Sequence, residues 1–240
     1  VANNVKKKIG INIIPNNKNF DIEIIYNMSQ DDGKKFTQKA GKVICISCKN
    51  SIDYKTMTED IAKNRDREML VIQIQKNNGR DYIIPTTEDK ELYEDAVNYF
   101  NLKRKEFEAN NLIPNEFIKP SFRRENHLWH YGIKHWDEYF DERQKLVLCT
   151  FLKNIKEICK IINNKEYRSV IALYLTSVLL QRVNMSGFGI PWNTSGEKPE
   201  HVLTLRRPSI LLNFAESNPF EKSRGSLNNI QQNIINGIIF

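Results

Sequence analysis

The chain has 240 residues, of which 40% are hydrophobic, so it is long enough to bury a core and is not composed like a disordered protein. Its formal net charge of +7 favours a polyanionic partner, although a lysine-rich chain can carry this charge without binding one. The longest apolar run, Ser169 to Leu180, is shorter than the roughly 20 residues that cross a bilayer, so it predicts a buried helix and no membrane partner.

The four cysteines are too few and too unevenly spaced for a disulfide framework. Together with the lack of a signal sequence, they predict a reducing, cytoplasmic setting. Neither the start at Val1 nor the apolar end from Ile234 to Phe240 resembles a polar natural terminus. We therefore expect a middle piece of a longer chain.

The first 86 residues predict β-hairpins, because short β-rich runs alternate with asparagine and glycine turns. The predicted strands cover Lys8 to Pro15, Phe20 to Asn27, Lys42 to Ile46, Leu70 to Gln75 and Arg80 to Pro85, and a charged helix is predicted over Met57 to Met69. This part is expected to be a β-rich, zinc-knuckle-like region.

A Cys-x-x-Cys motif, Cys45 to Cys48, follows the third predicted strand. Two thiolates at this spacing can reach one tetrahedral metal ion, with backbone N–H groups turned toward the sulfurs, so the motif predicts half of a zinc site. The other cysteines, Cys149 and Cys159, fall within helical periodicity and are predicted to be small core residues. A thioredoxin-like redox pair is an alternative, but the βαβ context it needs does not follow.

Residues 87–126 predict a charged helix and a linker. Thr86 or Thr87 is expected to cap a mostly solvated helix that runs to about Asn110, with acidic residues in its first turn. Its basic cluster, residues 103–105, is predicted to be a solvent-exposed helix face rather than a nucleic-acid-binding stripe. The stretch from Leu112 to Arg124 contains two prolines and no periodicity, which predicts a linker that wraps around the structure.

Three histidines, His127, His130 and His135, occur within nine residues and invite a metal interpretation. Aromatic residues alternate with them, which favours a packed turn with half-exposed imidazoles. After this turn, Asp141 is expected to cap a helix that runs to about Asn164.

A second helix is predicted from about Glu166 to Asn184 and is apolar nearly all round, so neighbours are expected to cover it on several sides. These two helices are predicted to form the core of residues 127–240, a helical region with a long contact loop.

The stretch from Val183 to Ser226 is long for a connection, and loops of this length are usually functional. It holds four of the ten glycines and the pair Arg206 and Arg207, and its residues look chosen for contact rather than packing. Trp192 within it is expected to be a core residue, and a base-stacking or wedge role is the alternative. A weak helix or strand follows Gly225.

Two segments resemble the zinc-ribbon-containing adenine-specific DNA methylase family of large DNA methyltransferases. They are Tyr131 to Leu146, which reads YGIKHWDEYFDERQKL, and Phe214 to Phe220, which reads FAESNPF and is followed by Gly225. Gly41 to Cys48 and Gly79 to Thr86 occupy the places of the second zinc knuckle of that family and of its GR-x-Y-x-x-PT strand. The motifs occur in the order of the family.

The resemblance implies an α+β insert or fragment between the cofactor half and the catalytic half of a Rossmann-like methyltransferase. The glycine-rich S-adenosylmethionine loop of the family, its DPPY tetrapeptide and its first cysteine pair do not occur in this sequence. We therefore expect a non-catalytic target-recognition region, with S-adenosylmethionine held by the full-length enzyme and zinc held in part by Cys45 and Cys48.

Double-stranded DNA and the rest of the methyltransferase chain are the partners that the resemblance implies. Arg206 and Arg207 are expected to contact phosphates or base edges, and Arg123, Arg124 and Lys222 to neutralise the DNA backbone. A surface salt-bridge role is the alternative for Arg206 and Arg207.

Two other functions stay open. The chain can be a protein-interaction or scaffold module of a phage-defence system, with the aromatic cluster from Trp129 to Phe140 as its docking face. It can also be a stand-alone redox or metal protein that uses Cys45 and Cys48.

Overall fold

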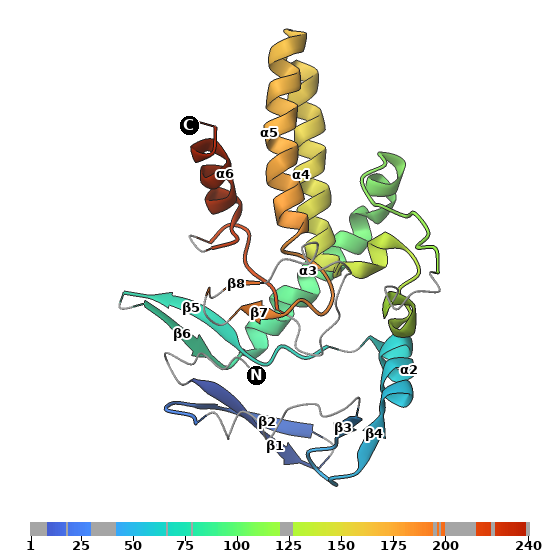
Figure 1. Cartoon of the computed structure of the whole chain (residues 1–240), viewed down its shortest axis with the longest axis vertical. Helices are drawn as coiled ribbons and strands as arrows, with labels where there is room; N and C mark the ends of the chain where they lie inside the picture. Colours follow the sequence, from blue (N-terminus) through green and yellow to red (C-terminus); the bar gives the residue numbers. More distant parts are fainter. Residues whose placement is uncertain are drawn as a thin grey trace. The chain divides into compact units, whose positions relative to one another are not determined.

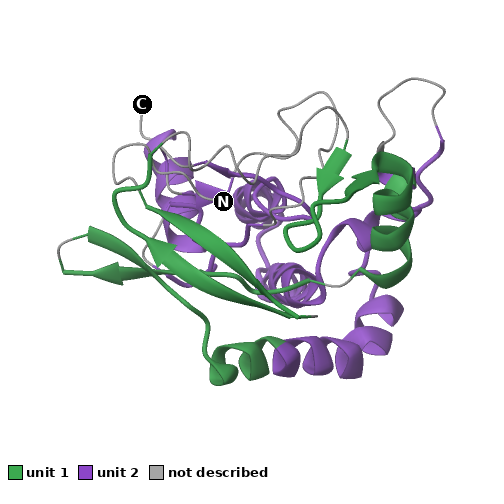
Figure 2. Ribbon diagram, turned by 90° about the horizontal axis from the view of Figure 1, so that it is seen from below, with its two compact units in different colours: residues 1–93, 130–132 green, residues 94–129, 133–240 purple. Residues whose placement is uncertain are grey.

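The computed structural model describes residues 9–17, 19–29, 42–65, 67–77, 79–120, 127–193, 196, 198–199, 215–221 and 224–238. The fold is mixed α+β, built from small antiparallel hairpins and α-helices. The chain divides into two compact units, residues 1–93 with 130–132 and residues 94–129 with 133–240 (Figure 2). No helix in the described part of the chain has the length and apolarity needed to cross a membrane.

Two hairpins of the first unit form where the sequence predicts them. Their strands are β1 (Gly10–Asn16), β2 (Asn19–Ile25), β5 (Ile72–Lys76) and β6 (Gly79–Ile83). β1 pairs antiparallel with β2, and β5 with β6. Asn17 in the first turn has φ of 54° and Gly79 at the second has φ of 118°, conformations that asparagine and glycine tolerate best.

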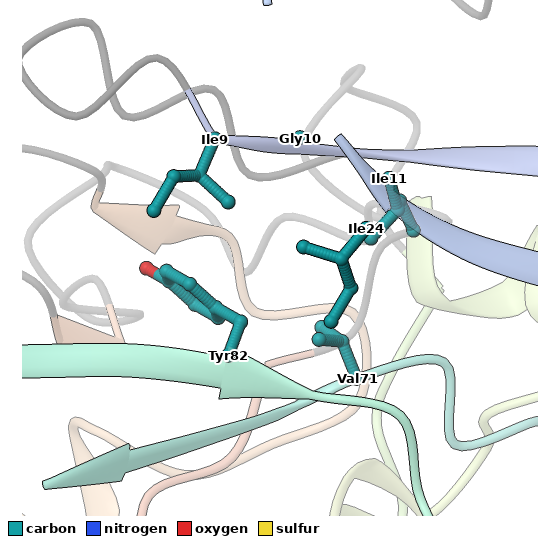
Figure 3. Close-up of a pocket in the computed structure, with 6 residues that line it drawn as sticks. All are labelled: Ile9, Gly10, Ile11, Ile24, Val71 and Tyr82. Atoms are coloured by element: carbon teal, nitrogen blue, oxygen red, sulfur yellow. The ribbon is translucent and has the colours of Figure 1, made fainter. Parts of the chain in front are cut away.

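An apolar cluster joins these two hairpins. Ile9, Ile11 and Ile24 point toward Val71 and Tyr82, as Figure 3 shows. The cavity left between them is about 10 Å³, enough for a single water at most, so this site takes no organic ligand.

A third hairpin leads into a helix whose ends differ from those predicted. β3 (Lys42–Ile44) pairs with β4 (Ser51–Asp53), and α2 (Tyr54–Asn64) follows directly. Asp53 caps α2, because its Oδ1 accepts a hydrogen bond from the Thr56 backbone N at 2.9 Å. The predicted boundaries at Met57 and Met69 are therefore wrong, and the helix ends at the left-handed Arg65.

The long charged helix, α3 (Thr87–Ala109), begins where the sequence predicts. Thr86 and Asp89 exchange hydrogen bonds across its first turn, at 2.8 Å and 3.2 Å. The helix is less solvated than expected, because Phe100 and Phe107 are buried and pack with Leu112. This cluster forms part of the core of the second unit.

Three further helices belong to the second unit: α4 (Glu142–Ile161), α5 (Lys165–Val183) and α6 (Leu227–Asn236). α4 and α5 lie side by side as a helical hairpin, and α6 packs against α5 (Figure 1). Val178, Met185 and Ile230 form the buried cluster between them. The predicted cap at Asp141 is confirmed, since its side chain accepts a hydrogen bond from Arg143 N at 2.8 Å.

One expectation about α5 is wrong. Within the second unit, its main contacts are with α4 and α6. Val170, Leu173 and Leu180 are 47%, 65% and 58% exposed, although the sequence predicts that neighbours cover the helix on several sides. The reason is that two neighbouring helices can cover only the face that carries Val178 and Leu179.

The histidine-rich segment forms two short 3₁₀ helices, η1 (His127–Tyr131) and η2 (Trp136–Tyr139). The His135 ring stands edge-on to Phe117, with 5.6 Å between ring centroids. Among the described residues, no three metal-binding side chains come together. The contacts of His135 agree with a packed turn.

The long stretch after α5 packs more than the sequence indicates. Ser186, Gly187 and Ile190 are buried, and a two-residue hairpin pairs β7 (Trp192–Asn193) with β8 (Lys198–Pro199). The expectation that this stretch is chosen for contact rather than packing is therefore wrong for Ser186, Gly187 and Ile190, whereas Asn218 and Phe220 are exposed. Long-range hydrogen bonds hold this stretch in part: Gly187 N donates to Gln144 Oε1 and Phe188 N to the Tyr139 carbonyl.

Candidate functional site

A buried polar cluster begins at the N-terminus of α4. Asp141 is fully buried and caps the helix, and Gln144 completes a capping box by accepting a hydrogen bond from the Asp141 backbone N at 3.3 Å. The Gln144 Oε1 also accepts a hydrogen bond from Gly187 N at 2.8 Å. This side chain therefore ties the start of α4 to the segment that follows α5.

Gly187 can make this contact because it has no side chain. Its φ is 138°, which L-residues rarely adopt, and a Cβ atom there would collide with the ring of Tyr139. The neighbouring Phe188 N donates to the Tyr139 carbonyl at 2.6 Å. A glycine is thus required where this segment crosses the end of η2.

Arg143 joins the two segments that carry the family resemblance. Its Nε and Nη2 donate to Glu216 Oε1 and Oε2 at 3.1 Å and 2.8 Å, a bidentate pair between residues 73 positions apart. The Arg143 side chain is 33% exposed and that of Glu216 is 14% exposed. The YGIKHWDEYFDERQKL and FAESNPF segments are therefore in contact at Arg143 and Glu216.

Arg182, near the end of α5, is the buried cation of this cluster and is 2% exposed. It donates to Ser217 Oγ at 2.7 Å, to the Ser217 carbonyl at 2.7 Å and to the Gly225 carbonyl at 3.0 Å. Its Nε has no hydrogen-bond partner within the described part of the chain. Burial lowers the pKa of Arg182, and the nearby Glu216 carboxylate opposes this shift.

Backbone hydrogen bonds also hold the first and last residues of the segment from Ala215 to Ser226. Ala215 N donates to the Ile190 carbonyl at 3.0 Å, and Leu227 N to the Pro219 carbonyl at 2.8 Å. Ser226 is fully buried and caps α6, with its Oγ 3.2 Å from Asn229 N. We call Arg143, Gln144, Arg182, Glu216 and Ser217 the arginine cluster.

The cysteine motif forms a tight turn between β3 and β4. Cys45 N donates to the Asn50 carbonyl at 2.9 Å and Lys49 N to the Cys45 carbonyl at 3.0 Å, with Lys49 in a left-handed conformation. Hydrogen bonds from the backbone of Cys48, and then of Ser47, lower the pKa of the Cys45 thiol. A hydrogen bond with the Cys48 side chain contributes further.

The turn fits half of a tetrahedral zinc site. It brings the two thiol groups together, stabilises the Cys45 thiolate that a metal ion needs, and leaves Cys48 exposed. Within the described residues, no third histidine, cysteine or carboxylate joins them. Any further ligands must come from outside these residues.

A scan against protein-family models and searches of curated proteins and solved structures found no match to this chain.

The five residues expected to contact DNA lie outside the described residues. They are Arg123, Arg124, Arg206, Arg207 and Lys222. Their role stays a prediction. Ala215 N donates to the Ile190 carbonyl at 3.0 Å, so described residues before and after Arg206 and Arg207 are hydrogen-bonded to each other.

The sequence alone did not single out Arg182 or Glu216 as residues that bind distant segments of the chain. A signal was present, because Arg182 is a charge within the apolar stripe of α5, and Glu216 is the only charge in the segment from 208 to 220. Buried charges are usually paired or hydrogen-bonded, so each indicated a specific partner. The identity of that partner required the tertiary structure.

Proposed function

We propose that this chain is the non-catalytic middle region of an S-adenosylmethionine-dependent, adenine-specific DNA methyltransferase, and that it contributes to DNA recognition. The observation that carries the proposal is the Arg143–Glu216 pair, which joins the two sequence segments that resemble the family. The two motifs share a structural role through this contact. They are therefore better explained as one feature of the family than as two independent chance matches to it.

The position of the arginine cluster supports a DNA-contacting role for the loop that contains Arg206 and Arg207. Ile190 and Ala215, which lie before and after Arg206 and Arg207 in the sequence, are hydrogen-bonded to each other, and Ala215 precedes the salt-bridged Glu216. Binding loops held by a rigid scaffold are a common arrangement for recognition. The net charge of +7 favours an anionic partner such as duplex DNA.

Cys45 and Cys48 have a zinc-binding role in this function, with the remaining ligands supplied from outside the described residues. The lowered pKa of the Cys45 thiol supports this role, because zinc binds thiolate rather than thiol. Bound zinc would hold the β3 and β4 hairpin to the segment that carries the other ligands. On its own, the chain should bind zinc sub-stoichiometrically.

DNA binding is tested by changing Arg206 and Arg207 to alanine together. Fluorescence anisotropy with a labelled duplex, measured across a series of salt concentrations, should show weaker binding. It should also show a slope of log K against log salt that is smaller by about 1.8, since each phosphate contact contributes about 0.9. The matched control is Lys160→Ala with Lys165→Ala, which removes the same charge from exposed positions at the α4 to α5 turn.

Equal affinity and equal slope in both double variants would contradict the DNA role of Arg206 and Arg207 and favour a scaffold module. A labelled methyl donor provides a second test. The purified chain should transfer no methyl group, because neither the glycine-rich loop nor the DPPY tetrapeptide occurs in the sequence. Measurable transfer would overturn the assignment to a non-catalytic region.

A further inference from the structure

The exposed side of α5 carries an apolar stripe. Val170, Leu173 and Leu180 are 47%, 65% and 58% exposed. Ser177 lies between the two leucines on the same side of the helix, which faces away from the buried Arg182. The four stripe positions are separated by three, four and three residues, the spacing of the a and d positions in a coiled coil. The stripe therefore has the pattern of a helix that pairs with another helix.

The serine hydroxyls on this side of α5 are already hydrogen-bonded. Ser177 Oγ donates to the Leu173 carbonyl at 2.9 Å, and Ser169 Oγ, at the edge of the stripe, donates to the Lys165 carbonyl at 3.0 Å. Both acceptors belong to α5 itself. A partner can therefore cover the stripe without leaving either hydroxyl donor unpaired, which is the usual cost of burying such a group.

The charge distribution favours a second copy of this chain as the partner. A two-fold contact places a surface against an identical surface, so every charge on it lies near a charge of the same sign. The chain has a formal net charge of +7, yet residues 169–181 include no lysine, arginine, aspartate or glutamate. Like-charge repulsion therefore does not oppose self-association here. An anionic partner such as DNA finds no cation on the stripe.

The stripe also matches itself in size when two copies run antiparallel. A two-fold axis at its middle places Leu173 of each copy against Ser177 of the other, and Val170 against Leu180. Ser177 is the smallest side chain of the stripe and leaves a gap between the two leucines, which a leucine can fill. A parallel pair would place Ser177 against Ser177 and leave that gap without contacts.

We propose that α5 is a self-association surface, through which two copies of this chain pair antiparallel across a two-fold axis. The stripe covers about three helical turns, so the contact is smaller than a standard protein interface of roughly 1,200 Å² or more. The dimer should accordingly be reversible, with a dissociation constant in the micromolar range. Its formation does not require DNA.

The test measures the molar mass of the 240-residue chain by sedimentation velocity at about 1 to 200 μM. The unchanged chain should shift from monomer to dimer over this range. Leu173→Glu should weaken the dimer at least about tenfold, because the contact would bury carboxylates that have no partner. The matched control is Leu102→Glu, since Leu102 is 76% exposed on α3, a different helix. It should dimerise as the unchanged chain does.

A charge swap tests the antiparallel arrangement. Ser177→Lys alone should also weaken the dimer, because it fills the gap with an unpaired cation. An equimolar mixture of the Leu173→Glu and Ser177→Lys chains should regain the dimer. The reason is that antiparallel pairing brings the introduced carboxylate of one chain beside the introduced amine of the other. Unfolded chains could not regain the dimer in this way, so the mixture also controls for loss of fold.

Three results would overturn the inference. A chain that stays monomeric at about 200 μM would leave the stripe to a different protein or to another part of a longer chain. A dimer that Leu173→Glu leaves unchanged would form through another surface. A mixture that stays monomeric would exclude the antiparallel contact of Leu173 with Ser177. DNA binding is tested separately by the double-arginine variant, so the two proposals can fail independently.

Discussion

The cysteine turn and the arginine cluster are built in opposite ways. The turn uses residues that are neighbours in the sequence, from Cys45 to Asn50, and its polar groups lie near the surface. The cluster joins Arg143 to Glu216 across 73 positions and Arg182 to Gly225 across 43, and most of it is buried. Local turn chemistry determines the first, and tertiary packing determines the second.

This difference predicts where substitutions act. A change in the cysteine turn should alter chemistry at the sulfurs and leave the helices intact. A change in the arginine cluster should destabilise the second unit, because it removes contacts that hold distant segments together.

Gly187→Ala should give the largest loss. The added methyl group collides with Tyr139, and the backbone conformation at φ of 138° is strained for alanine. Urea unfolding should show a loss of about 3 kcal/mol or more. In the control, Gly237→Ala, the new Cβ lies at least 3.5 Å from its nearest neighbours, so stability should change by about 0.5 kcal/mol or less. Equal stability in both variants would show that the second unit tolerates a rearranged crossing.

Arg182→Met should destabilise by about 2 to 3 kcal/mol, because it leaves the buried carbonyls of Ser217 and Gly225 without donors. The exposed Arg224 provides the control, and Arg224→Met should change stability by about 0.5 kcal/mol or less. Chemical denaturation of both variants measures the difference. A stabilised Arg182→Met chain would mean that desolvation of the guanidinium outweighs its hydrogen bonds.

A double-mutant cycle on Arg143 and Glu216, with both residues changed to alanine singly and together, should give a coupling energy of about 1 to 2 kcal/mol. The pair is bidentate and only partly exposed. The same cycle on Lys55 and Glu59, whose side chains are 84% and 65% exposed, should give about 0.3 to 0.5 kcal/mol. Equal coupling energies in the two cycles would show that the Arg143–Glu216 pair is no stronger than an exposed surface ion pair.

The smallest effect on stability should come from the cysteine turn, where the readout is chemical. A variant that keeps only Cys45 should be alkylated with a pH midpoint lower in the folded chain than in the same chain unfolded in urea. Hydrogen bonds from the Cys48 and Ser47 backbones lower the pKa of the Cys45 thiol, so the reactive thiolate persists to lower pH. A midpoint that is equal or higher in the folded chain would contradict this geometry.

Several elements of the fold were predictable because their causes are local. The hairpin turns at Asn17 and Gly79 and the helix caps at Thr86 and Asp141 depend on residues within a few positions of each other. The arrangement of the Cys45 and Cys48 turn was predictable for the same reason. Helix boundaries were less so, since the cap at Asp53 lies next to an unpredicted strand, β4.

The arginine cluster was decided only in the tertiary structure. The sequence supplied the motif residues Arg143 and Glu216, but no periodicity or spacing relates positions so far apart. α4 and α6 cover one face of α5 and leave Leu173 and Leu180 exposed. Because α5 is apolar nearly all round, its sequence could not predict which face is exposed. Local propensity is a property of neighbouring residues, whereas the partner of a buried charge depends on which segments the whole fold brings together.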